Sequence, residues 1–162
     1  MFYRLATFLL APLLVFGMYH LLTWFDVLRI NERAAWTRVA IASAISHVLL
    51  ATGFLAFSYF QFKSSVSLGG AGTAYGPYLF NQPEFWRLMM VFDTAAMLAI
   101  LGLSSALDRA GINPPGLLAV TFAITYAIGT LQWFLIGGAV GGLLERFWAG
   151  LKTGDEEDEE WL

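Results

Sequence analysis

Four long apolar stretches alternate with polar ones along the chain. They cover residues 5–25, 39–62, 88–107 and 117–144. The hydrocarbon core of a bilayer is about 30 Å thick, so a helix that crosses it needs about 20 mostly apolar residues. Each stretch reaches that length and is apolar on all sides, without the alternation that is typical of membrane-barrel strands. The pattern therefore predicts four membrane-spanning helices.

The connections between these stretches set the expected topology. Residues 26–38 and 108–116 form short polar connections, whereas residues 63–87 form a longer one that is rich in glycine and proline turn sequences. Short connections make consecutive helices antiparallel neighbours. We therefore expect an all-α membrane protein in which residues 1–150 form one antiparallel bundle of four transmembrane helices. Residues 151–162 are expected to form an acidic, disordered tail.

The composition supports a protein that is embedded in lipid. Of the 162 residues, 58% are hydrophobic and 13% are charged. A typical soluble domain is about 45–50% apolar and about 25% charged, so this composition excludes a water-soluble enzyme and a disordered chain. The chain has no basic patch, which excludes a nucleic-acid-binding domain. It contains no cysteine, which excludes disulfides, iron–sulfur clusters and thiol catalysis.

The distribution of charge predicts where the termini lie. Four spans place both termini on one side, and Lys and Arg residues then divide almost evenly between the two sides. The segment Asp155–Glu160 holds six of the twelve acidic residues. We expect a multi-pass protein with both termini in the cytoplasm, and a dual-topology protein is the alternative. The two sets of basic residues are Arg4, Lys63, Arg87, Arg146 and Lys152 on the side of the termini, and Arg29, Arg33, Arg38 and Arg109 opposite.

Asp93 is the one acidic residue inside a predicted span. A charge inside the bilayer costs several kcal/mol, so such a residue normally faces the bundle interior and has a partner. One hypothesis makes Asp93 a coupling carboxylate of a small transporter or channel. The alternative places Asp93 near the headgroups, where it would pair with Lys63 or Arg87.

Two histidines also lie within the predicted spans. His20 is in the first and His47 in the second, and the short connection between these spans makes them antiparallel neighbours. The histidines could therefore lie in nearby layers and hold a b-type haem or share a proton path. The alternative is structural: His20 belongs to an interfacial aromatic group, and His47 forms a hydrogen bond across the bundle.

The fourth span carries two patterns of small and polar residues. Gly137 and Gly141 form one pair of glycines spaced four apart, and Gly138 and Gly142 form another, which is typical of close helix packing in lipid. This packing is either internal to the bundle or part of an oligomer interface. A second face groups further residues at helical spacing and is expected to point into the bundle; its members are Thr121, Thr125, Gly129 and Gln132.

No catalytic, cofactor-binding or metal-ligating motif is present in the sequence, so we expect a protein that is not an enzyme and carries no cofactor. We expect a non-enzymatic scaffold or accessory subunit of a membrane complex. Its partners would be the lipid bilayer and either another membrane protein or further copies of itself. The small transporter that uses Asp93 is the alternative, with the Thr121, Thr125 and Gln132 face as its lining. A haem protein that uses His20 and His47 is a distant third.

Overall fold

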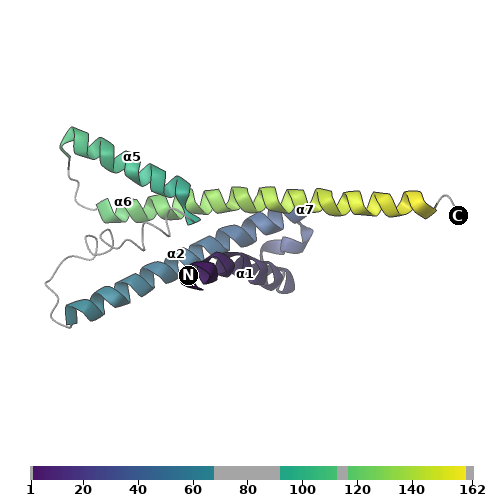
Figure 1. The fold of residues 1–162 in the computed structure, drawn as a ribbon, viewed down its shortest axis with the longest axis horizontal. Coiled ribbons are helices and arrows are strands. Elements are labelled where there is room, and N and C mark those ends of the chain that lie inside the picture. Colours follow the sequence, from purple (N-terminus) through teal and green to yellow (C-terminus); the bar gives the residue numbers. More distant parts are fainter. Residues whose placement is uncertain (1, 68–91, 113–116, 160–162) are drawn as a thin grey trace. The chain divides into compact units, whose positions relative to one another are not determined.

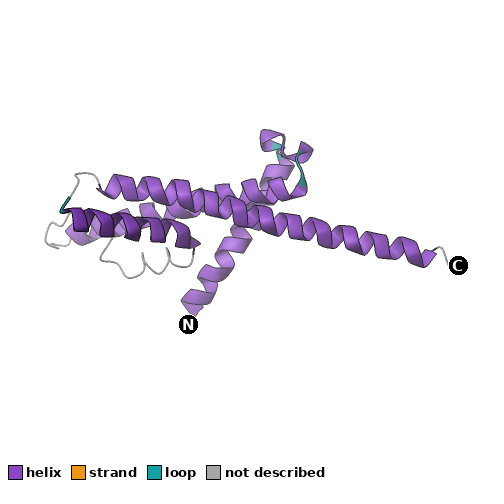
Figure 2. Ribbon diagram, turned by 90° about the horizontal axis from the view of Figure 1, so that it is seen from above, coloured by secondary structure: helices purple, strands orange, loops and turns teal. Residues whose placement is uncertain are grey.

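The computed structural model describes residues 2–67, 92–112 and 117–159 (Figure 1). Every regular element in these ranges is a helix, which confirms the all-α class (Figure 2). The elements are α1 (Phe2–Trp24), the 3₁₀ helix η1 (Val27–Glu32), α2 (Ala35–Ser67), α5 (Thr94–Ala110), α6 (Leu117–Ile124), the π-helical turn η2 (Thr125–Gly129) and α7 (Thr130–Glu159).

Two of the helices are long and apolar enough to cross a membrane. They comprise Ala35–Val66, with a hydropathy of 1.9, and Ala119–Gly150, with a hydropathy of 1.6. Only 28% and 17% of their most apolar parts are buried within the protein, so most of these parts are at least partly accessible. A core helix of a water-soluble protein would instead be mostly buried. The described part of α1 adds a shorter apolar helix over Leu9–Trp24.

The predicted and observed boundaries differ most at the start of the third span and at the C-terminal segment. The third span was expected to begin at residue 88, but α5 begins at Thr94, and residues 88–91 lie outside the described residues. The backbone of α7 continues to Glu159, so most of the segment expected to be a disordered tail is helical. Glutamate and lysine have good helix propensity, which favours this continuation beyond the apolar stretch.

The chain divides into two compact units. The first comprises Met1–Ser46 with Trp133–Leu162, and the second comprises His47–Gln132. Each unit is held by its own group of apolar side chains. In the first, Leu22 of α1, Ile30 of η1 and Ala42 of α2 are buried together. In the second, a cluster on α5 packs against α2, α6 and η2; it consists of Ala96, Met97 and Ile100, with Phe54, Leu55, Phe122, Ile124 and Ile128 around it.

The first unit also contains a close contact between α2 and α7. Gly141 lies against the backbone of Trp36: a Cβ at Gly141 would lie 2.7 Å from the Trp36 Cα. A Cβ at Gly137 would overlap the Ser43 side chain and would lie 2.9 Å from the carbonyl oxygen of Val39. The other glycine pair is less crowded, because a Cβ at Gly138 would meet its nearest neighbour at 3.5 Å, an ordinary van der Waals distance. Of the two glycine pairs, only Gly137 and Gly141 need to be glycine for this packing.

This difference predicts opposite results for two double substitutions. Gly137→Ala with Gly141→Ala should lower the free energy of unfolding by about 2–6 kcal/mol, because each added methyl group overlaps α2. Gly138→Ala with Gly142→Ala should be neutral or stabilising, since alanine favours the helix. Unfolding by SDS titration in detergent micelles, followed by circular dichroism, would measure both. Equal losses in the two variants would contradict the assigned contact.

Candidate functional site

The second unit contains a buried pair of ionisable side chains. His47 of α2 is 1% exposed, and Asp93, immediately before α5, is 6% exposed. The Nε2 atom of His47 lies 2.8 Å from Oδ1 of Asp93, which is ion-pair distance. A buried carboxylate is tolerated only when a partner compensates for the lost hydration. The histidine is that partner here, so the pair joins α2 to the start of α5.

The other ring nitrogen of His47 is engaged by the last segment of the unit. His47 Nδ1 lies 2.9 Å from Oγ1 of Thr130, at hydrogen-bond distance. A neutral imidazole has one donor and one acceptor nitrogen, and a hydroxyl can serve either of them. Contacts at both nitrogens therefore fix the plane of the ring. Asp93, His47 and Thr130 form a three-residue polar cluster, called the His47 cluster below.

Gln132 allows the Asp93 carboxylate to take part in this cluster. Asp93 is the N-cap residue of α5, where an aspartate side chain ordinarily accepts a hydrogen bond from the first turn of the helix. No such bond is made by Asp93. Instead the Gln132 side chain accepts the N–H of Ala95 at 2.9 Å and donates to the carbonyl of Phe92 at 3.3 Å. The glutamine amide thus caps α5, and the carboxylate remains available to face His47.

The π-helical turn η2 brings backbone against the same pair. Gly129, its last residue, is so close that a Cβ there would lie 2.7 Å from Nε2 of His47 and 2.8 Å from Oδ1 of Asp93. No side chain larger than hydrogen fits at that position without displacing the pair. Turns of π-helix inside longer helices are rare and frequently occur at functional sites. Here η2 supplies the surface that closes the His47 cluster on one side.

The predicted polar face of the last helix is partly found at this site. Thr121 and Thr125 are buried, and the Thr125 hydroxyl donates to the Thr121 carbonyl at 3.0 Å, a bond within its own helix. Gln132 reaches α5 as described above. A further contact links α2 to η2, where the hydroxyls of Thr52 and Tyr126 lie 2.8 Å apart. These side chains therefore form hydrogen bonds with backbone groups of the helices and with one another.

The alternatives for Asp93 and the histidines can be compared with this geometry. The carboxylate of Asp93 faces His47 rather than Lys63, which is exposed; Arg87 lies outside the described residues. His20 is exposed in the first unit, where its ring contacts the edge of Phe16 at a centroid distance of 4.3 Å. Both nitrogens of His47 have protein groups beside them. This arrangement does not support the haem hypothesis.

No family model, curated protein or solved structure matches this chain. Among the described residues, no three acidic or histidine side chains lie close enough together to hold a metal ion.

Sequence reasoning missed Thr130 and the special position of Gly129. Gly129 was expected on the same polar face as Thr121 and Thr125, and all three residues are buried, but nothing in its spacing pointed to His47. Thr130 is 83 residues from His47 along the chain. The sequence does indicate that the Thr130 hydroxyl needs a hydrogen-bond partner, because it lies in an apolar stretch. The sequence does not identify that partner.

The His47 cluster has a defined chemical capacity. A carboxylate oxygen lies 2.8 Å from one imidazole nitrogen, and a threonine hydroxyl lies 2.9 Å from the other and can serve either tautomer of the ring by reorienting its own hydrogen. The same contacts also hold three segments of the second unit together. The cluster therefore combines side chains of the type that can carry protons with contacts that lock helices, and experiments must separate these roles.

Proposed function

We propose that this chain is a multi-pass integral membrane protein that acts as a non-enzymatic scaffold or accessory subunit of a membrane complex. The observation that carries the proposal is the outward-facing apolar surface of the two long helices, of which only 28% and 17% is buried in their most apolar parts. Exposed apolar surface on this scale needs lipid or another membrane protein to cover it. The large exposed side chains include Leu131, Leu135, Ile136, Val140 and Leu143 on α7.

The polar side chains support a structural role over a pathway for solutes. In the described parts of the second unit, the buried polar groups contact one another or the helix backbone, as in the His47 cluster and the Gln132 cap. A pathway for a polar solute would need groups that face a water-filled space. In this proposal the remaining two crossings are made by α1 and by the segment that includes α5. Both termini then lie on one side, which we propose to be the cytoplasm.

The absence of cysteine allows a direct test of topology. Single substitutions Glu32→Cys, Lys63→Cys, Ala110→Cys and Leu162→Cys can be labelled with a membrane-impermeant maleimide in intact and opened cells. Four crossings predict that Glu32→Cys and Ala110→Cys react together from one side. Lys63→Cys and Leu162→Cys should react together from the other. Any other grouping would contradict four crossings.

The scaffold role is tested by purification in a mild detergent, followed by mass measurement of the intact assembly. A different membrane protein present in fixed stoichiometry is the expected result. A preparation that contains only this chain, as a monomer or small oligomer, would contradict the accessory-subunit proposal.

The His47 cluster favours a second candidate, a small proton-coupled transporter in which Asp93 is the coupling carboxylate. Proteoliposomes that contain a pH-sensitive dye and an imposed potassium diffusion potential would measure proton flux. A transporter predicts flux that is abolished by Asp93→Asn and retained by Asp108→Asn, a control at an exposed aspartate near the end of α5. Flux that is absent, or unchanged by Asp93→Asn, would remove this role.

A further inference from the structure

The turn between α1 and α2 has an unusual backbone. Asp26, Leu28 and Arg29 adopt positive φ angles of 47°, 59° and 52°, and none of them is glycine. A left-handed conformation costs a non-glycine residue roughly 1–2 kcal/mol, more for a branched or bulky side chain. Three such residues within four positions need support from the surrounding structure. Strained segments of this kind concentrate at binding and switching sites.

Several hydrogen bonds and one buried side chain hold this turn in place. Asn31 donates its backbone N–H to Asp26 Oδ1 at 3.0 Å and its side-chain amide to the carbonyl of Thr23 at 3.0 Å. The Arg38 guanidinium donates to the carbonyls of Arg33 and Asn31, both at 2.8 Å. Ile30 is 1% exposed and anchors η1 in the apolar core of the first unit. These hydrogen bonds and the burial of Ile30 thus stabilise the conformation of the turn.

Two arginines of the turn remain available to a ligand. Arg29 and Arg33 are exposed, and neither forms an ion pair with a carboxylate in the described part of the chain. Arg33 makes one long hydrogen bond, from Nε to the carbonyl of Leu28 at 3.4 Å, which leaves its terminal nitrogens free to donate. The segment from Asp26 to Arg38 carries three arginines against the two acids Asp26 and Glu32, so its net charge is +1.

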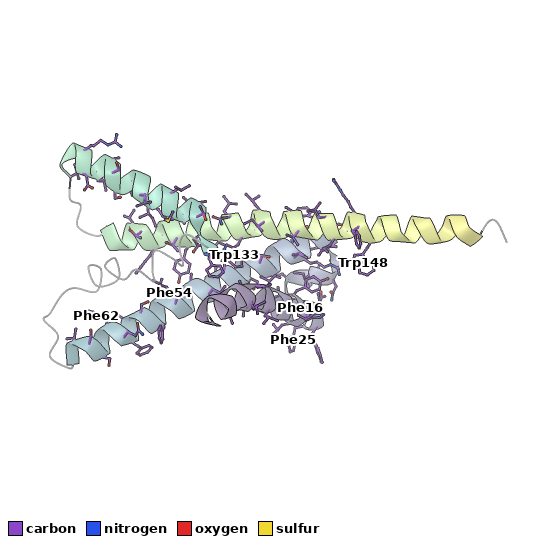
Figure 3. All side chains as sticks on the ribbon, viewed as in Figure 1. Phe16, Phe25, Phe54, Phe62, Trp133 and Trp148 are labelled. Atoms are coloured by element: carbon purple, nitrogen blue, oxygen red, sulfur yellow. The ribbon has the colours of Figure 1, made fainter. Side chains whose placement is uncertain are left out.

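Large exposed apolar side chains flank these arginines along the chain. Trp24 is 85% exposed, Phe25 70% and Leu28 60%, and Trp36 at the start of α2 is 45% exposed. Figure 3 shows Phe25 projecting from the turn that follows α1. Tryptophan beside arginine is typical of the membrane–water interface, where the ring lies at headgroup depth and the guanidinium meets phosphate. The exposed aromatic rings of this turn are therefore suited to the membrane–water interface.

We infer that the turn from Trp24 to Trp36 binds the phosphate of an anionic phospholipid headgroup, with Arg29 and Arg33 as the donors. The inference rests on the proposed membrane location. Guanidinium groups recognise phosphate through paired N–H donors, and the neighbouring aromatic rings contact the acyl and glycerol region of the same lipid. Charge complementarity and the apolar surroundings together point to lipid in the bilayer rather than to a soluble anion.

Native mass spectrometry of the full chain in a mild detergent tests this site, with phosphatidylglycerol or phosphatidylcholine added as the probe. The wild-type chain should bind phosphatidylglycerol more tightly. Arg29→Gln with Arg33→Gln should weaken that binding by about fivefold for each arginine removed. The control, Arg109→Gln with Arg146→Gln, loses the same charge elsewhere and should retain the preference. Arg29→Lys with Arg33→Lys keeps the charge but loses the paired guanidinium donors, so its binding should lie between that of the wild type and that of the glutamine variant.

Three outcomes would overturn the inference. They are equal binding of the two lipids by the wild-type chain, equal losses in the test and control variants, and displacement of the lipid by millimolar inorganic phosphate. The last would assign the site to a soluble anion. Cysteine labelling reports the number of crossings whatever the headgroup preference, so failure of this site and failure of the proposed topology are distinguishable.

Discussion

Replacement of Asp93 by alanine is expected to lower the free energy of unfolding by about 3–5 kcal/mol, the cost of breaking a buried ion pair by removing one partner. Asp93 is 6% exposed, and its Oδ1 lies 2.8 Å from Nε2 of His47, which is itself 1% exposed. Without the carboxylate, the buried imidazole loses the group that faces its Nε2 atom. Reversible unfolding in SDS-containing micelles would measure the loss.

The matched control is Asp108→Ala, which removes an exposed carboxylate at the other end of α5 and should change stability by less than about 0.5 kcal/mol. A double-mutant cycle then isolates the pair. Asp93→Ala and His47→Ala together should cost less than the sum of the two single losses, because each removes the same interaction. Strictly additive losses would show that the two side chains do not depend on each other.

Replacement of Gly129 by alanine is expected to destabilise the same cluster. The added methyl group would lie 2.7 Å from Nε2 of His47 and 2.8 Å from Oδ1 of Asp93, closer than any real contact of a Cβ. The pair or η2 must shift, and such overpacking costs about 1–3 kcal/mol. The same SDS titration would measure this loss. Chemical shifts of the His47 ring in labelled protein should also change, since the added group contacts the imidazole directly.

Gly102→Ala in α5 is the control for this substitution. A Cβ at Gly102 would meet nothing within 4 Å, so the change should stabilise the helix by about 0.5–1 kcal/mol. If Gly129→Ala were as well tolerated as Gly102→Ala, the close approach of η2 to the His47 cluster would be wrong. Combining Gly129→Ala with Asp93→Ala should cost less than the sum, because the second change makes room for the first.

The two glycine pairs of α7 illustrate how far a sequence pattern reaches. Both pairs have the spacing of four that is typical of close helix packing, and sequence reasoning treated them alike. In the structure Gly137 and Gly141 meet α2, whereas Gly138 and Gly142 leave ordinary space for a methyl group. Spacing predicts that two residues share a face but does not predict which face meets a neighbour. That choice depends on the rotation of the helix about its axis, which a π-helical turn such as η2 changes.

Asp93 shows the same limit at the candidate site. Its presence in an apolar stretch left two interpretations open, a carboxylate that faces the bundle interior with a partner and one near the headgroups that pairs with Lys63 or Arg87. In the structure Asp93 is buried beside His47. The expected helical start at residue 88 did not anticipate that Asp93 would be the N-cap residue of α5. Gln132, predicted only as part of a polar face, caps that helix and leaves the carboxylate to His47. No local pattern reveals such a division of roles.

The sequence by itself determined the all-helical class and the low charge of the helices, because helix formation and hydropathy depend on residues within a few turns of one another. It also indicated which residues were candidates, since an ionisable side chain in an apolar stretch stands out. Only the tertiary structure decided that His47 lies between Asp93 and Thr130, against the backbone of Gly129. These contacts join distant parts of the chain, and they depend on how helices are rotated and aligned when they pack.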